Sequence, residues 1–164
     1  MEDAGLFQMV RHLGGLSHSP GYPLFTTLFK SFVPIPMAKL IAGNLVSILF
    51  ALCALLVLYE IVLFLTQDAR AALLAMILCG ISVTFWSQAI IIEVYNLALF
   101  LFLLSFLLLL NYIKTHQLRY LYSWVLVSGL LLPNHWPLFM LPSIGCLFYF
   151  MNLAAHGCCK IADH

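Results

Sequence analysis

Long apolar runs separated by short polar turns dominate the chain from residue 37 onward. The runs are apolar all round rather than along one stripe, as expected of helices surrounded by lipid or by other helices. The first run, at about 37–65, exceeds the roughly 20 residues needed to cross the hydrocarbon core of a bilayer. The pattern predicts five membrane-spanning helices, at about 37–65, 71–92, 96–113, 120–132 and 136–153.

The first 36 residues have a different pattern, because glycine and proline interrupt them repeatedly. The breakers are Gly14, Gly15, Pro20, Gly21, Pro23, Pro34 and Pro36. Such a density of breakers excludes a long helix. Between them lie two short amphipathic segments, roughly 4–13 and 23–33, each of the length of a helix that lies in the membrane interface. The predicted organisation is therefore a loop at 1–36 with interfacial helices, an all-α polytopic transmembrane bundle at 37–153, and a tail at 154–164.

The polar turns can be assigned to membrane faces, because consecutive short turns must alternate between the two sides. The loop 1–36 and the turns 93–95 and 133–135 then share one face, and the turns 68–70 and 114–119 share the other face with the tail. The second face carries Arg70, Lys114, Arg119 and Lys160, and the first carries Arg11, Lys30 and Lys39. By the excess of positive charge on cytoplasmic loops, the second face and the tail are assigned to the cytoplasm, and the loop 1–36 is extracytoplasmic, or periplasmic.

Composition excludes several other classes of protein. Of the 164 residues, 64% are hydrophobic and 8% are charged, whereas about a quarter are charged in a soluble domain. The net charge of +1 leaves no basic footprint for nucleic acid, so membrane lipid is the expected surrounding partner. The acidic start Met1-Glu2-Asp3 does not resemble the basic region of a signal peptide.

The five cysteines do not predict a disulfide framework or a metal centre. Cys53, Cys79 and Cys146 lie inside apolar runs, where a small soft side chain packs. Cys158 and Cys159 are close to histidines, but adjacent cysteines converge poorly on a tetrahedral site. No metal and no cofactor are therefore predicted.

Polar side chains gather at the extracytoplasmic face, and polar groups at membrane depth are costly enough to suggest a function. Glu93 directly follows a run of three isoleucines, where a carboxylate needs a partner. The alternative without a function is that Glu93 ends a helix and faces the lipid headgroups. Asp3 is equally well explained as a solvated terminus, and His135 as a turn cap. His18 and Tyr22 lie in a turn that two prolines and a glycine stiffen.

Five motifs in order resemble those of a known membrane family. They are Asp3-Ala4-Gly5, His18-Ser19-Pro20-Gly21-Tyr22-Pro23-Leu24, Phe85-Trp86-Ser87-Gln88, Glu93-Val94-Tyr95 and Asn134-His135. This protein O-mannosyltransferase-like family, formerly catalogued as a domain of unknown function, is similar to the GT-C glycosyltransferases and includes an animal O-mannosyltransferase of plexin-type receptor domains. The resemblance covers roughly residues 2–145.

The resemblance implies transfer of a sugar, such as mannose, from a polyprenyl-phosphate-linked donor to a hydroxyl of a protein or glycan acceptor at the extracytoplasmic face. It implies that Asp3 is the general base and that the reaction inverts the anomeric carbon, by analogy with inverting glycosidases. The resemblance also implies a set of substrate-binding residues, and the stiff turn at 18–23 brings Tyr22 into it. The set is His18, Tyr22, Gln88, Glu93, Tyr95, Asn134 and His135.

The chain departs from the family pattern in two respects. Leu6 stands where a glutamate commonly follows the Asp-x-Gly motif, so the base assignment depends on Asp3. The family also commonly has a transmembrane helix before the loop and further helices after the last motif, so the chain is expected to be a shortened or fragmentary version. Alternative functions are a non-catalytic membrane scaffold, a degenerate remnant, or a transporter. Short loops and no targeting peptide indicate a bacterial inner membrane.

Overall fold

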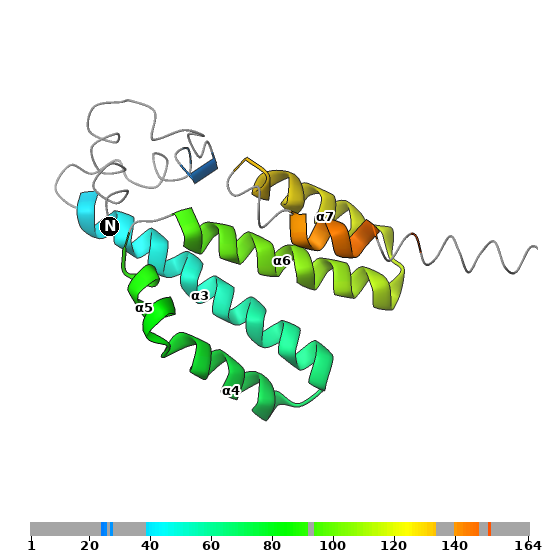
Figure 1. The fold of residues 1–164 in the computed structure, drawn as a ribbon, viewed down its shortest axis with the longest axis horizontal. Helices are drawn as coiled ribbons and strands as arrows, with labels where there is room; N and C mark the ends of the chain where they lie inside the picture. The colour runs from blue at the N-terminus through cyan, green and yellow to red at the C-terminus, as the bar shows by residue number, and fades with distance from the viewer. Residues whose placement is uncertain are drawn as a thin grey trace, which may run out of the picture.

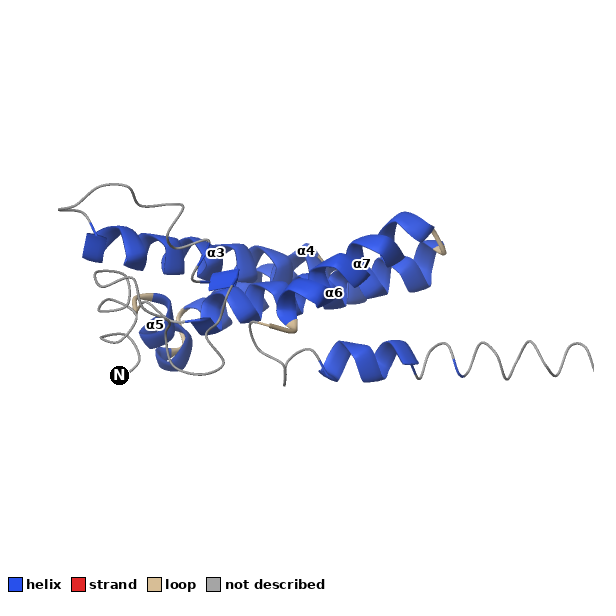
Figure 2. Ribbon diagram, turned by 90° about the horizontal axis from the view of Figure 1, so that it is seen from above, coloured by secondary structure: helices blue, strands red, loops and turns tan. Residues whose placement is uncertain are grey.

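The computed structural model describes residues 24, 25, 27, 39–91, 94–133, 140–147 and 151, and every regular element among them is helical (Figures 1 and 2). The labelled helices are α3 (Lys39–Thr66), α4 (Ala69–Gly80), α5 (Val83–Ala89), α6 (Val94–Thr115) and α7 (Leu118–Leu131). Residues 140–147 form a further helical segment. The predicted all-α fold is confirmed for this part of the chain.

Four of the helices lie side by side in the order α4, α3, α6, α7 (Figure 1). α3 and α4 form one antiparallel hairpin, and α6 and α7 form a second. The two hairpins pack through their first helices, α3 and α6, which run in the same direction. α5 lies at the end of the bundle where α6 begins (Figure 1).

Two of the described helices are long and apolar enough to cross a membrane, namely Asn44–Thr66 within α3 and Val94–Thr115, which is α6. A third span results if α4 and α5 count as one bent helix pair. α7 has only 14 residues, fewer than the roughly 20 that cross the hydrocarbon core. The prediction of five spans is therefore not confirmed. Of the two predicted interfacial segments, 4–13 lies outside the described residues, and Leu24, Phe25 and Thr27 of the other are helical.

The span predicted at about 71–92 is not one continuous helix, because the helix breaks at Ile81 and Ser82. α4 and α5 meet there at an angle of 67°. Ser82 has an extended backbone, and its hydroxyl accepts a hydrogen bond from the amide of Phe85 over 3.2 Å, which caps a new helix. Serine and β-branched residues have low helix propensity, but Ile81 and Val83 are as apolar as the helices around them. Hydropathy therefore did not reveal the break.

The turns of the two hairpins are built alike and lie at the same end of the bundle. Gln67 and His116 each occupy the left-handed region, with φ of 56° and 53°, and each amide closes a helix end. The threonine before each of them donates its hydroxyl to the carbonyl four residues back over 2.8 Å. Lys114 Nζ lies 4.8 Å from the centroid of the Phe64 ring, so the two turns are neighbours. We call this end of the bundle, with Gln67, Asp68, His116 and Gln117, the turn end.

A buried apolar cluster occupies the opposite end. It consists of Phe25, Val94, Leu97, Ala98, Leu101, Val127 and Leu131. Phe25 is only 3% exposed and packs against the start of α6 and the end of α7. Burying one phenylalanine side chain contributes about 1.5–3 kcal/mol. Phe25 therefore lies at the same end of the bundle as α5.

Candidate functional site

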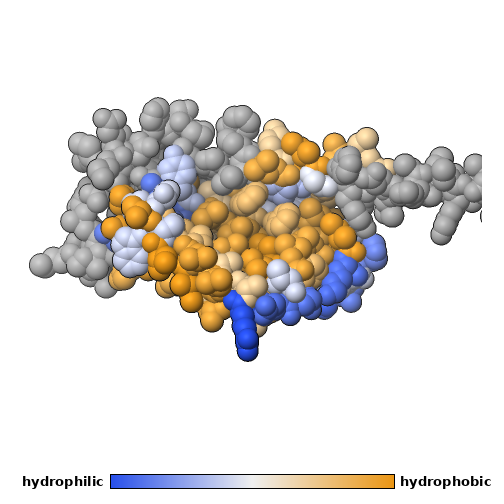
Figure 3. Space-filling model, turned by 60° about the horizontal axis from the view of Figure 1, so that its bottom comes forward, coloured by the Kyte–Doolittle hydropathy of each residue, from blue (hydrophilic) through white to orange (hydrophobic). Residues whose placement is uncertain are grey.

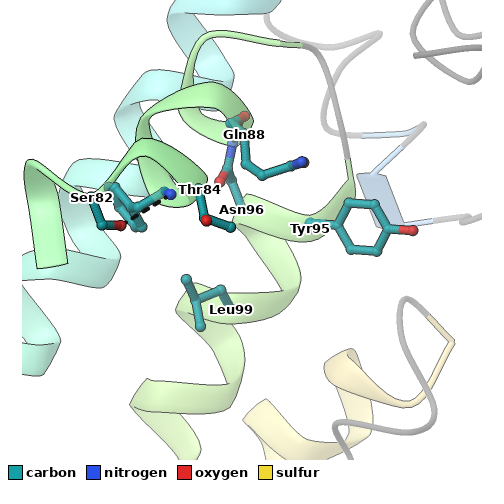
Figure 4. Close-up of a pocket in the computed structure, with 7 residues that line it drawn as sticks. Ser82, Thr84, Gln88, Tyr95, Asn96 and Leu99 are labelled. Carbon is teal, nitrogen blue, oxygen red and sulfur yellow. Dashed lines mark hydrogen bonds between the residues drawn. The ribbon is translucent and has the colours of Figure 1, made fainter.

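A cavity of about 500 Å³ lies beside the helix break, between α5 and the start of α6 (Figure 4). It is lined by Ser82, Thr84, Phe85, Gln88, Tyr95, Asn96 and Leu99. These side chains are brought together because the chain turns sharply at Ser82 and again between α5 and α6. The lining combines hydroxyl and amide groups with two apolar side chains.

Asn96 holds the helices that form the wall of this cavity together. The residue is 3% exposed, and its Nδ2 donates to Ser47 Oγ over 2.6 Å and to the carbonyl of Gln88 over 2.9 Å. Ser47 Oγ in turn donates to the carbonyl of Ile91 over 2.7 Å. The last carbonyls of a helix have no partner within it, and lipid offers none. Asn96 and Ser47 therefore satisfy the end of α5 and tie it to α3 and α6.

Gln88, which lines the cavity, has an unsatisfied side-chain acceptor. Its Oε1 is buried and has no hydrogen-bond partner, although a buried carbonyl oxygen left without a donor costs roughly 1–3 kcal/mol. An amide oxygen can only accept.

Tyr95 lies at the other edge of the cavity. It is 51% exposed, and its ring extends away from Ser82 and Thr84 (Figure 4). Gln88 and Tyr95, two of the predicted substrate-binding residues, thus line one cavity from two different helices.

The other predicted site residues lie outside the described residues. They are Asp3, His18, Tyr22, Glu93, Asn134 and His135. Described residues close to them in sequence, namely Phe25, Val94 and Leu131, belong to the apolar cluster at the cavity end of the bundle. The roles of these six residues remain predictions.

Sequence reasoning missed three residues that build the site: Ser47, Ser82 and Asn96. Ser82 is a small residue of the kind that allows close helix contact, but it caps α5 instead. Gly80 does make such a contact, because a Cβ there would lie 3.3 Å from Leu55 Cδ1. The available signal for Asn96 was an amide at the start of an apolar run, directly after Tyr95.

Metal-binding chemistry finds no support in the described part of the chain, where no three His, Cys, Asp or Glu side chains gather in a group that could hold an ion. The exposed lining of the cavity is mainly apolar, and its polar part comes from neutral amides and hydroxyls. The prediction that no metal is used remains a prediction.

Comparison with known proteins gives one match. The family described as the protein O-mannosyl-transferase TMEM260 N-terminal domain matches residues 3–156. No curated protein and no solved structure gives a significant match. The apolar helices and this family together make the chain an integral membrane protein. Since the match covers nearly the whole sequence, the chain belongs to the family of the TMEM260 protein O-mannosyl-transferase N-terminal domain.

Proposed function

We propose that the chain is a segment of a GT-C-like glycosyltransferase that transfers a sugar, such as mannose, from a polyprenyl-phosphate-linked donor. The acceptor is a hydroxyl of a protein or glycan at the extracytoplasmic face. The proposed location is a bacterial inner membrane, with five crossings in which α7 and the segment 136–153 are the last two. The cavity end of the bundle then faces the extracytoplasmic side.

One observation carries the proposal. The family match over residues 3–156 coincides with a cavity lined by Gln88 and Tyr95, which the resemblance had implicated in substrate binding. Fold membership alone does not specify an activity. A cavity at the implicated residues supplies a place for the reaction.

The chemistry of the cavity suits an amphiphilic donor. Phe85 and Leu99 offer apolar surface, whereas Gln88 contributes an amide and Ser82 and Thr84 contribute hydroxyls. Trp86, on the neighbouring face of α5, is 63% exposed, as is typical of an indole anchored at the membrane interface. A cavity at this depth can hold a sugar phosphate beside the amides while its hydrocarbon chain remains in lipid.

In the proposed reaction Asp3 removes the proton of the acceptor hydroxyl, and the oxygen attacks the anomeric carbon. The bond from that carbon to the phosphate oxygen breaks, so the polyprenyl phosphate leaves with the electron pair. Glu93 and Tyr95 shape the site, and His18, Tyr22, Gln88, Asn134 and His135 bind phosphate or sugar hydroxyls. Attack opposite the leaving group inverts the anomeric configuration.

A transfer assay tests the proposal. The longest available version of the protein is reconstituted with labelled polyprenyl-phosphate mannose and a serine- and threonine-containing acceptor. Gln88→Ala is expected to raise the apparent KM for the donor about tenfold, since a lost hydrogen bond to a ligand is worth roughly 1–2 kcal/mol. Ser87→Ala, at the neighbouring half-buried residue, which does not line the cavity, is the matched control.

Asp3→Asn tests the catalytic role separately. It is expected to lower kcat by a factor of roughly 10²–10⁴, the usual contribution of a general base. Unchanged transfer by Asp3→Asn would exclude Asp3 as the base, and no transfer by the unaltered protein from any lipid-linked sugar would refute the proposed activity.

The bend between α4 and α5 favours a transporter as second candidate. Broken helices at the binding site are common in transporters, where the free helix ends contact the substrate. Uptake of a sugar into protein-containing vesicles without any lipid-linked donor would support transport. Transfer that requires the lipid-linked donor would exclude it.

A further inference from the structure

Three exposed basic side chains, Arg70, Lys114 and Arg119, gather at the turn end of the bundle. Arg70 follows the first turn, and the other two flank the second. Hydrophilic residues are concentrated along this edge and border directly on a broad apolar surface (Figure 3). The contact of Lys114 with Phe64 of α3 brings both hairpins into one basic surface, which we call the basic edge.

Aromatic rings hold two of these cations without neutralising them. Lys114 Nζ lies 4.8 Å from the Phe64 ring centroid, and the Arg119 guanidinium lies 4.9 Å from that of Tyr120. Arg119 Nη2 also donates to the Tyr120 hydroxyl over 3.3 Å. A cation on a ring face keeps its positive charge available to an anion.

The acidic residue nearest in sequence does not cancel the charge. Asp68 Oδ1 accepts a hydrogen bond of 2.8 Å from the backbone amide of Arg70, and so caps α4. Within the part of the chain that the structure describes, none of the three basic side chains forms an ion pair with a carboxylate. The basic edge therefore has a net positive charge.

The two arginines do not stabilise the helices in which they lie. Arg70 and Arg119 lie in the first turns of α4 and α7, neither of which has an acidic residue there. A positive charge near a helix N-terminus is unfavourable, because the helix dipole is positive at that end. At α4 the Asp68 cap offsets this cost. At α7 the N-cap Gln117 makes no side-chain hydrogen bond, so an anion outside the chain explains the position of Arg119 better than helix stability does.

Exposed leucines show where that anion must come from. Leu65, Leu73 and Leu118 are large apolar side chains beside the basic edge, and each is about half exposed or more. A soluble anion would leave them in water, whereas a bilayer covers them and presents phosphate groups at the adjoining depth. We propose that the basic edge binds the headgroups of anionic phospholipids in one leaflet. This site lies opposite the cavity and does not depend on the proposed function.

Lipid retention measures the preference directly. The chain is placed in nanodiscs of equal parts phosphatidylglycerol and phosphatidylcholine, which share a phosphodiester but differ in net charge, and bound lipids are identified by native mass spectrometry. The unaltered chain is expected to retain phosphatidylglycerol preferentially. The combined variant Arg70→Gln, Lys114→Gln, Arg119→Gln is expected to lose the preference, at about fivefold for each charge removed.

Matched variants distinguish an effect of the basic edge from an effect of the total charge of the chain. The combination Arg11→Gln, Lys30→Gln, Lys39→Gln removes as many charges from residues that the sequence assigns to the other membrane face, and it should keep the preference. The combination Arg70→Lys with Arg119→Lys should keep it too. If the first combination does not fold, raising the salt concentration must weaken the preference of the unaltered chain. Retention of the preference by the first combination, its equal loss in the control combination, or insensitivity to salt would each overturn the proposal.

Discussion

The amide of Asn96 joins three segments that are far apart in sequence. It donates to Ser47 of α3 and to the carbonyl of Gln88, and Ser47 passes the network on to Ile91. Each of these acceptors lies where neither water nor a helix supplies a donor. The side chain therefore determines where α5 ends, and with it the position of Gln88 in the cavity wall.

Replacing Asn96 with alanine is expected to lower the free energy of unfolding by about 1–3 kcal/mol, because two buried acceptors lose their donor. The measurement is equilibrium unfolding in mixed micelles with increasing dodecyl sulfate. Asn111→Ala is the control, since the Asn111 amide donates only to the Leu107 carbonyl of its own helix. Equal losses for the two variants would show that Asn96 has no special role in joining the helices.

At the level of single residues, the sequence predicted the site only in part. Gln88 and Tyr95 were recognised because they belong to motifs, and both line the cavity. Asn96 was assigned to a membrane span. Its neighbours in the sequence do not show that its amide binds the end of another helix. Its role depends on Ser47, which is 49 residues away, and only the packing of α3 against α6 reveals that relation.

Among the helices, length and hydropathy predicted α3 and α6 but not the break after α4. A 28-residue apolar helix such as α3 can be recognised from composition alone. Predicting the break would require knowing that Ser82 caps a helix inside an apolar run. A continuous helix and a capped, broken one have the same hydropathy. The positive φ of Gln67 and His116 was hidden for a similar reason, because glycine usually marks that conformation.

The cap at Ser82 is expected to control the order of α5. Ser82→Ala removes the acceptor for the Phe85 amide and should cost about 1 kcal/mol, so amides in α5 should exchange with deuterium roughly fivefold faster. Hydrogen–deuterium exchange of the peptide covering 83–89 measures this. Ser87→Ala provides the control, because the Ser87 hydroxyl donates to the Thr84 carbonyl at an exposed position. No acceleration in Ser82→Ala would show that the bend is held by packing alone.

Considered as a whole, the molecule has two chemically different ends separated by the length of its helices. At a rise of 1.5 Å per residue, α6 is about 33 Å long, comparable to the roughly 30 Å hydrocarbon core. The cavity lies near its start, and the basic edge lies at its end. A bilayer that encloses α3 and α6 therefore separates the cavity from the basic edge.

This separation predicts a definite pattern of labelling with a membrane-impermeant maleimide. In a background without the five native cysteines, Ala69→Cys lies directly after the first turn, at the start of α4, and Gln117→Cys lies in the second turn. Both should react from the same compartment. Tyr95→Cys, at the cavity, should react from the other, because α3 and α6 run in the same direction and carry both turns to one face. Reaction of the two turn positions from opposite compartments would contradict the parallel arrangement of the hairpins. Reaction of Tyr95→Cys on the side of the turns would remove the cavity from the extracytoplasmic face, and with it the proposed donor site.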